Sequence, residues 1–79
     1  MLKQAKVGSK VQGTYHGQVF SGTIRAIEPD FTARGTCHLF VDLDAPIPTP
    51  SAARRTSLFL GSVNIRSGRG AFFQVEVLS

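Results

Sequence analysis

The sequence predicts an all-β fold of five strongly bent, antiparallel strands. Apolar and polar residues alternate with a period of two in several short segments, which is typical of strands with one buried face. Turns rich in glycine and proline separate these segments. No stretch of useful length carries apolar residues at helical spacing, and the 79 residues correspond to one domain.

The segment from Val11 to Ile27 predicts the hairpin around which the other strands are organised. Its two strands span residues 9–16 and 18–28, and His16-Gly17 supplies the turn, because glycine tolerates a positive φ. Gly22 lies within the second strand, where glycine often marks a bulge or bend. One face of the first strand carries Val11, Gly13 and Tyr15, and one face of the second carries Phe20, Gly22, Ile24 and Ala26.

Three further strands are predicted over residues 36–43, 56–61 and 71–78. Between the first two, the prolines at every second position of segment 45–55 exclude a central strand and a helix. The segment 61–70 is too polar and glycine-rich for a long strand and predicts a turn or hairpin loop. The predicted core comprises Ile24, Leu39, Val41, Leu58, Phe73 and Val75.

Composition indicates an expected cellular location and bears on whether the chain carries a membrane span or a secretory signal. A single cysteine excludes an internal disulfide, so a cytoplasmic location is expected. No apolar run approaches the roughly 18 residues of a membrane-spanning helix, and the N-terminus lacks the apolar segment of a secretory signal. Residues 1–8 show little patterning and predict a short arm that leads into the barrel.

The sequence carries no pattern that names a reaction. Cys37 and His38 are neighbours on a predicted strand, so their side chains point to opposite faces, and Cys37 is expected to be an inert core thiol. Asp42 and Asp44 share one face, but two carboxylates are too few ligands for a specific metal site. His16 lies in a turn. The expectation is therefore a non-enzymatic protein without catalytic residues, metal or cofactor.

The succession of strands resembles the SH3-like small barrels, the group that includes Tudor, KOW and Sm-type domains. The segments that carry the resemblance are KVQGTY, QVFSGTIRAI, HLFVDLD and SLFL, followed by a turn and a closing strand. It covers nearly the whole chain and implies a five-stranded SH3-like barrel over residues 1–79. The sequence lacks the aromatic cage of a methyl-lysine-binding Tudor domain, and it lacks the acidic and aromatic residues with which SH3 domains bind proline peptides.

A net charge of +4 favours an anionic partner. Arginine binds phosphate or carboxylate through two parallel hydrogen bonds, and the arginines concentrate in predicted loops. Nucleic acid or a nucleoprotein complex is thus the expected partner, with Phe31 or Phe59 available for base stacking. The alternative is that these arginines are only solvated at the ends of loops and bind no partner. The candidate partner-binding residues are Arg34, Arg54, Arg55, Arg66 and Arg69.

A second hypothesis places a protein partner on the outer face of the sheet. Phe40, Phe59 and Phe72 fall in the register that faces away from the core, and an exposed phenylalanine cluster marks a partner or dimer surface. The alternatives are a second core or a loop that covers this face. The corresponding function is a homodimeric adaptor or a small inhibitor of the kind found in phages and plasmids, such as an anti-CRISPR protein. A structural subunit of a larger assembly is the third hypothesis.

Overall fold

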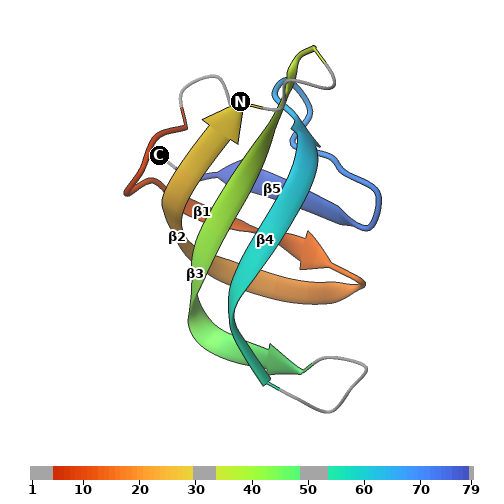
Figure 1. The fold of residues 1–79 in the computed structure, drawn as a ribbon. Helices are drawn as coiled ribbons and strands as arrows, with labels where there is room; N and C mark the ends of the chain where they lie inside the picture. Colours follow the sequence, from red (N-terminus) through yellow and green to blue (C-terminus); the bar gives the residue numbers. More distant parts are fainter. Residues whose placement is uncertain (1–4, 30–33, 49–53, 79) are drawn as a thin grey trace.

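The computed structural model describes residues 5–29, 34–48 and 54–78, and its strands form one curled sheet. The sheet is antiparallel throughout, with the strand order β4-β3-β2-β1-β5, and it curls into a half-barrel (Figure 1). The predicted all-β class with five bent antiparallel strands is confirmed. The strands are β1 (Lys10–Tyr15), β2 (Gln18–Pro29), β3 (Thr36–Pro48), β4 (Arg54–Asn64) and β5 (Phe73–Val77).

The β1–β2 hairpin has the predicted two-residue turn. His16 and Gly17 adopt φ values of 49° and 80°. Positive φ at both central residues is the mark of a type I′ turn, whose twist matches that of the flanking strands. The pairing runs from Tyr15 opposite Gln18 to Lys10 opposite Thr23, so the turn fixes the register of the hairpin.

A β-bulge bends β2 against β3. The register passes from Ile24 opposite Val41 to Ala26 opposite Phe40, which leaves Arg25 as the extra residue. One inserted residue exchanges the two faces of a strand. Ala26 therefore lies on the outer face, and Ile27 packs against the core in its place. The expectation that Ala26 shares a face with Phe20, Gly22 and Ile24 is wrong, and the bulge lies beyond Gly22.

The proline-containing segment takes part in the sheet, contrary to expectation. β3 continues to Pro48, and Ile47 and Pro48 lie opposite Arg55 and Arg54 at the start of β4. The pairing of β3 with β2 ends at Leu43, so beyond this point β3 pairs on one side only. An N–H is not needed on the unpaired side, and proline is tolerated there. Residues 49–53, with the predicted loop tip, lie outside the described residues.

The core fills the concave side of the half-barrel. Five of the six predicted core residues are buried, whereas Phe73 is only partly buried. Ile47 adds a side chain from the segment that was expected to be a loop. The buried apolar residues are Val11, Phe20, Ile24, Cys37, Leu39, Val41, Ile47, Leu58, Leu60, Val63 and Val75.

The remaining boundaries differ by a few residues from those predicted. β4 extends through Gly61 to Asn64, and the last strand is shorter than the predicted 71–78. Residues 1–4 lie outside the described residues, and the backbone N–H of Gly8 donates to the carbonyl oxygen of Ile24 on β2 at 2.8 Å. Within the described ranges, the structure holds no helix long and apolar enough to cross a membrane.

Candidate nucleic-acid interface

Three of the five candidate arginines lie in the segments at one end of the half-barrel. Arg34 precedes β3, and Arg66 and Arg69 follow β4. Because β3 and β4 are antiparallel, the start of one lies beside the end of the other, and the Ile65 N–H donates to the Gly35 carbonyl oxygen at 2.8 Å. We refer to Arg34, Arg66 and Arg69 as the arginine end. A pocket opens there, lined by Arg34, Gly35, Asn64, Ile65 and Arg66.

Asn64 holds the backbone of this end in place. Its side-chain Oδ1 accepts hydrogen bonds from the N–H groups of Arg66 at 2.9 Å and Ser67 at 3.0 Å. Its backbone N–H donates to the carbonyl oxygen of Arg69 at 2.9 Å, and its own carbonyl accepts from Gly68 at 2.8 Å. Asparagine commonly organises turns in this way. The loop therefore presents exposed arginine side chains on a fixed backbone.

The acidic residues on β3 pair with cations outside the arginine end. Lys10 Nζ lies 3.1 Å from Asp44 Oδ1, and Arg25 Nε lies 3.6 Å from Asp42 Oδ1. Neither of these two ion pairs includes a residue of the arginine end.

The other two candidate arginines lie at the opposite end of the β3–β4 hairpin. Arg54 and Arg55 begin β4, opposite Pro48 and Ile47, whereas Arg34 precedes the start of β3 (Figure 1). Their side chains, and all of Phe31, lie outside the part of the chain that the structure describes. The five arginines predicted as one set are therefore divided between the two ends of a hairpin.

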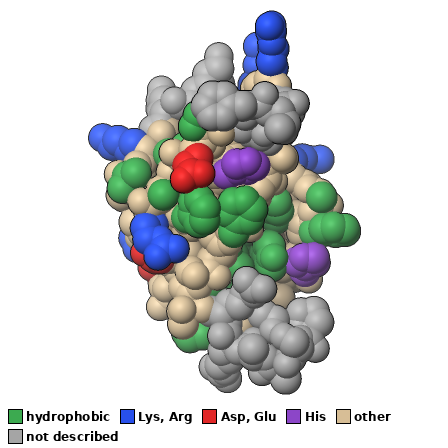
Figure 2. Space-filling view, in the orientation of Figure 1, with side chains coloured by type: hydrophobic (Ala, Val, Ile, Leu, Met, Phe, Trp, Pro, Cys, Tyr) green, Lys and Arg blue, Asp and Glu red, His purple; other side chains and the backbone are tan. Residues whose placement is uncertain are grey.

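An aromatic cluster lies between these ends, on the outer face of β3 and β4. The ring centroids of Phe40 and Phe59 are 5.0 Å apart, and those of His38 and Phe59 are 5.4 Å apart. Phe59 is 51% exposed, and Phe40 and His38 are partly buried. We refer to His38, Phe40 and Phe59 as the aromatic surface. Figure 2 shows hydrophobic side chains gathered on the face over β3 and β4, with histidine beside them.

A bulge in β4 fixes the imidazole of His38. Cys37 lies opposite Val63 and Leu39 opposite Leu60, so Gly61 and Ser62 together face His38. Ser62 adopts a φ of 55°, and its N–H donates to His38 Nδ1 at 3.0 Å. The glycine before it leaves room for a neighbouring ring, since a Cβ there would lie 3.0 Å from Phe59 Cε2. The Gly-Ser pair inside the strand was the available signal for this bulge.

Phe72, the third predicted member of the outer cluster, belongs to a different group. Its ring stacks on that of His16, with centroids 5.0 Å apart and an angle of 15° between the ring planes. The ring centroids of His16 and Tyr15 are 4.5 Å apart. This group lies at the β1–β2 turn, where the His16 N–H donates to the Phe72 carbonyl oxygen at 2.8 Å. The structure thus brings Phe40 and Phe59 together and places Phe72 on another part of the molecule.

The residues considered for catalysis point in different directions. Cys37 faces the core and is 7% exposed, and burial raises the pKa of its thiol. His38 lies on the outer face, where its Nδ1 accepts the hydrogen bond from Ser62. Asp42 and Asp44 are held in the two ion pairs. Among the described residues, no group of three or more His, Cys, Asp and Glu side chains is placed to hold a metal.

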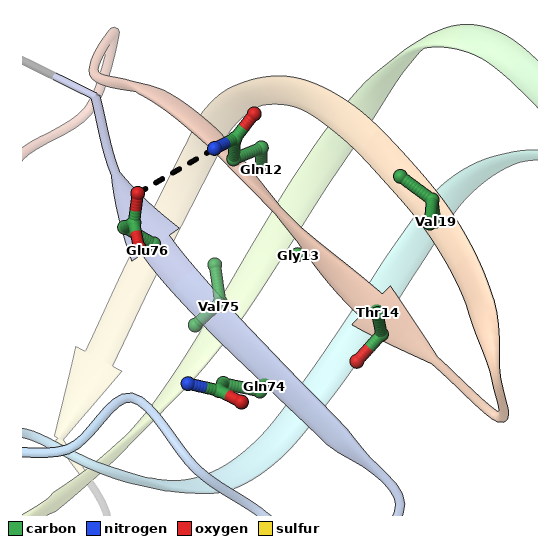
Figure 3. A pocket seen from close by; sticks show the side chains of 7 residues that line it. All are labelled: Gln12, Gly13, Thr14, Val19, Gln74, Val75 and Glu76. Carbon is green, nitrogen blue, oxygen red and sulfur yellow. Dashed lines mark hydrogen bonds between the residues drawn. The ribbon is translucent and has the colours of Figure 1, made fainter.

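A second hollow lies on the other half of the sheet, over β1 and β5 (Figure 3). Gly13 contributes no side chain to it, and Gln12 Nε2 donates to Glu76 Oε1 at 3.5 Å. Its lining holds a carboxylate and no arginine, so it does not favour an anion. The lining residues are Gln12, Gly13, Thr14, Val19, Gln74, Val75 and Glu76.

Comparison with known proteins corrects the expected family. A family model described as "Glyoxalase superfamily protein" matches residues 1–64, a range that ends with β4. Neither the curated proteins nor the solved structures gave a match. The resemblance to SH3-like, Tudor, KOW and Sm-type domains is wrong at the level of family. Short alternating strands with Gly and Pro turns arise in many curled sheets, so they indicate architecture and not descent. The chain therefore belongs to the family of glyoxalase superfamily proteins that this model describes.

Proposed function

We propose that this protein is a non-enzymatic module that binds an anionic partner, nucleic acid or a nucleoprotein complex, through its arginine end. The observation that carries the proposal is the meeting of Arg34 and Arg66 around one pocket, with Arg69 on the same ordered loop. Guanidinium groups match phosphate in geometry and in charge. Phosphate contacts of this kind supply the sequence-independent part of nucleic-acid affinity.

The positions of the reactive side chains support a non-enzymatic role. Glyoxalase superfamily proteins include enzymes. In this chain the thiol of Cys37 faces the core and the imidazole of His38 faces outward, so they do not form a nucleophile–base pair. The two aspartates on β3 each contact a cation.

A salt titration tests the proposal directly. The protein is mixed with a fluorescent oligonucleotide of about 20 nucleotides, longer than the roughly 4–16 nucleotides that one small domain covers. We expect log K to fall linearly with log salt. The double variant Arg34→Ala, Arg66→Ala removes two phosphate-binding side chains and should reduce the slope by about 1.4 to 1.8, at about 0.7 to 0.9 for each phosphate.

The matched control is Lys6→Ala, Lys10→Ala, which removes two exposed cations outside the arginine end. In this control, most of the slope of log K against log salt should remain. Equal losses in both double variants would show that net charge alone acts, and the arginine end would then not be a site. Absence of binding by the wild-type protein to single-stranded and duplex DNA and RNA would also refute the proposal.

A second candidate function is a dimeric adaptor or inhibitor that acts by protein contact. Exposure of Phe59 beside Phe40 on the outer face favours it. Sedimentation of the wild-type protein and of Phe59→Ala over a range of concentrations tests it. A dimer that dissociates in the variant, combined with no nucleic-acid affinity, would favour this function over the first.

A further inference from the structure

We infer that the partner is single-stranded nucleic acid, with bases stacked on the aromatic surface of His38, Phe40 and Phe59. The inference deepens the proposed function and depends on it. The arginine end would hold phosphates, and the outer face of β3 and β4 would hold the bases. This division of roles explains two features with one ligand. The described ion pairs include no residue of the arginine end, and an exposed phenylalanine ring, Phe59, lies in the aromatic cluster beside that end.

The ring geometry suits bases. Phe40 and Phe59 lie on adjacent strands directly opposite one another, with ring planes inclined at 48° and centroids 5.0 Å apart. The His38 ring extends the cluster and is held by the hydrogen bond from Ser62. Ala26, with its small side chain, lies opposite Phe40 on β2. Rings that are fixed before binding lose little freedom when a base stacks on them.

The arginine end and the aromatic surface are continuous along one hairpin. Thr36 lies opposite Asn64 at the end of the β3–β4 ladder, with Arg34 and Arg66 just beyond it. Arg34 lies in the turn just before Thr36, and from Thr36 to His38 is two residues of strand, about 7 Å at roughly 3.3 Å per residue. One short segment of nucleic acid can therefore contact both, since small domains cover about 4–16 nucleotides of single strand.

The charges around the aromatic surface favour a single strand over a duplex. Glu28 lies opposite His38, and Asp42 lies further along β3 beside Arg25. The Glu28 carboxylate repels a phosphate backbone that crosses this face, whereas the charge of Asp42 is paired with that of Arg25, and neither opposes the neutral faces of bases. In a duplex those base faces are already stacked on each other, and only a single strand presents them to protein rings.

The test compares Phe59→Leu with Phe72→Leu in binding to a labelled single strand and to its duplex. Leucine keeps an apolar side chain and removes the ring. Phe72 is the matched control, an exposed phenylalanine at 68% that lies in the other aromatic group. We expect Phe59→Leu to weaken single-strand binding by about 5- to 150-fold, as stacking of one base is worth about 1–3 kcal/mol. The salt slope should stay unchanged, and Phe59→Trp should restore affinity.

Each outcome assigns a result to one of the two proposals. If Arg34→Ala, Arg66→Ala weakens binding and Phe59→Leu does not, the proposed function stands and the stacking inference is refuted. Equal weakening of single strand and duplex by Phe59→Leu also refutes stacking. If Phe59→Leu causes a homodimer to dissociate and leaves oligonucleotide binding unchanged, the aromatic surface is a protein interface. Absence of binding by the wild-type protein refutes both.

Discussion

At the scale of single residues, alternation along a strand predicted burial well wherever the register is unbroken. Leu39 and Val41 are fully buried as expected, and Leu58 and Phe59 face opposite sides of the sheet. The expectation for Phe73 failed because Phe73 is the first residue of β5, at the end of the strand, whereas Val75 further along the same strand is buried. Its ring packs over Gly70, where an added Cβ would overlap it.

Cys37 predicts a measurable dependence of stability on pH. Burial raises the pKa of its thiol in the folded state above that of the unfolded chain, which is about 8.5. The folded protein thus holds this proton more tightly. The stabilisation is complete below about pH 8.5 and is lost as the pH rises through the folded pKa. The free energy of unfolding, relative to Cys37→Ala, should fall there by at most about 1.4 kcal/mol per pH unit.

Urea unfolding of both proteins between about pH 7 and about pH 10 measures this difference and cancels the other titrating groups that both share. A difference that stays constant over that range would mean that the thiol is hydrated in the folded state. Labelling by a thiol reagent gives an independent reading, because a buried thiol should react in the native protein far more slowly than in the unfolded chain.

At the scale of elements, the sequence predicted the number of strands and their antiparallel arrangement but not their irregularities. The bulge at Arg25 and the bulge at Gly61 and Ser62 depend on how two strands meet, which neither strand determines alone. The prolines of β3 led to a wrong prediction for the same reason. A strand tolerates them here because the pairing of β2 with β3 ends at Leu43. Arg34 and Arg66 were named from the sequence, but their meeting follows only from the β3–β4 register.

Gly13 is the element-scale position that we expect to tolerate substitution least. It lies in β1 between β2 and β5, and a Cβ there would overlap the backbone carbonyl oxygen of Gln74. A backbone atom cannot rotate away as a side chain can, so β5 would have to move. Gly13→Ala should lower the free energy of unfolding by about 3 kcal/mol, at the upper end of typical overpacking costs.

The control for this change is Thr14→Ala, an exposed position on the same strand. It should change the free energy of unfolding by less than about 0.5 kcal/mol. Urea unfolding measures both variants. A Gly13→Ala protein as stable as the wild type would show that β5 lies further from β1 than the structure has it.

At the scale of the whole molecule, the sheet is curled but not closed. The radius of gyration is 11.7 Å, close to the roughly 12 Å expected for a folded chain of this length. Among the described strands, β4 and β5 form the two edges, so the outer face of β4 with its neighbour β3 ends at an open margin. The β3–β4 hairpin carries arginines before β3, after β4 and at the start of β4, with the aromatic surface in the middle.

This arrangement predicts that the two basic ends of the hairpin act independently. The double variant Arg54→Ala, Arg55→Ala should weaken nucleic-acid binding alike for all sequences, with a slope smaller by about 0.7 to 0.9 for each phosphate that the variant no longer binds. The fold should persist, because the predicted core includes neither residue. In the quadruple variant that also carries Arg34→Ala and Arg66→Ala, the loss of binding free energy should equal the sum of the losses in the two double variants within about 0.5 kcal/mol. Changes at sites more than about 7–10 Å apart are usually additive.

Salt titrations of the wild type, both double variants and the quadruple variant measure this. If the partner is a protein, the same Arg54→Ala, Arg55→Ala change should slow association and make it less sensitive to salt, whereas Phe59 would govern dissociation. A double variant with unchanged affinity and unchanged salt dependence would show that Arg54 and Arg55 end a solvated loop. Binding would then involve one end of the hairpin, and a single strand held at the arginine end would extend no further than the aromatic surface.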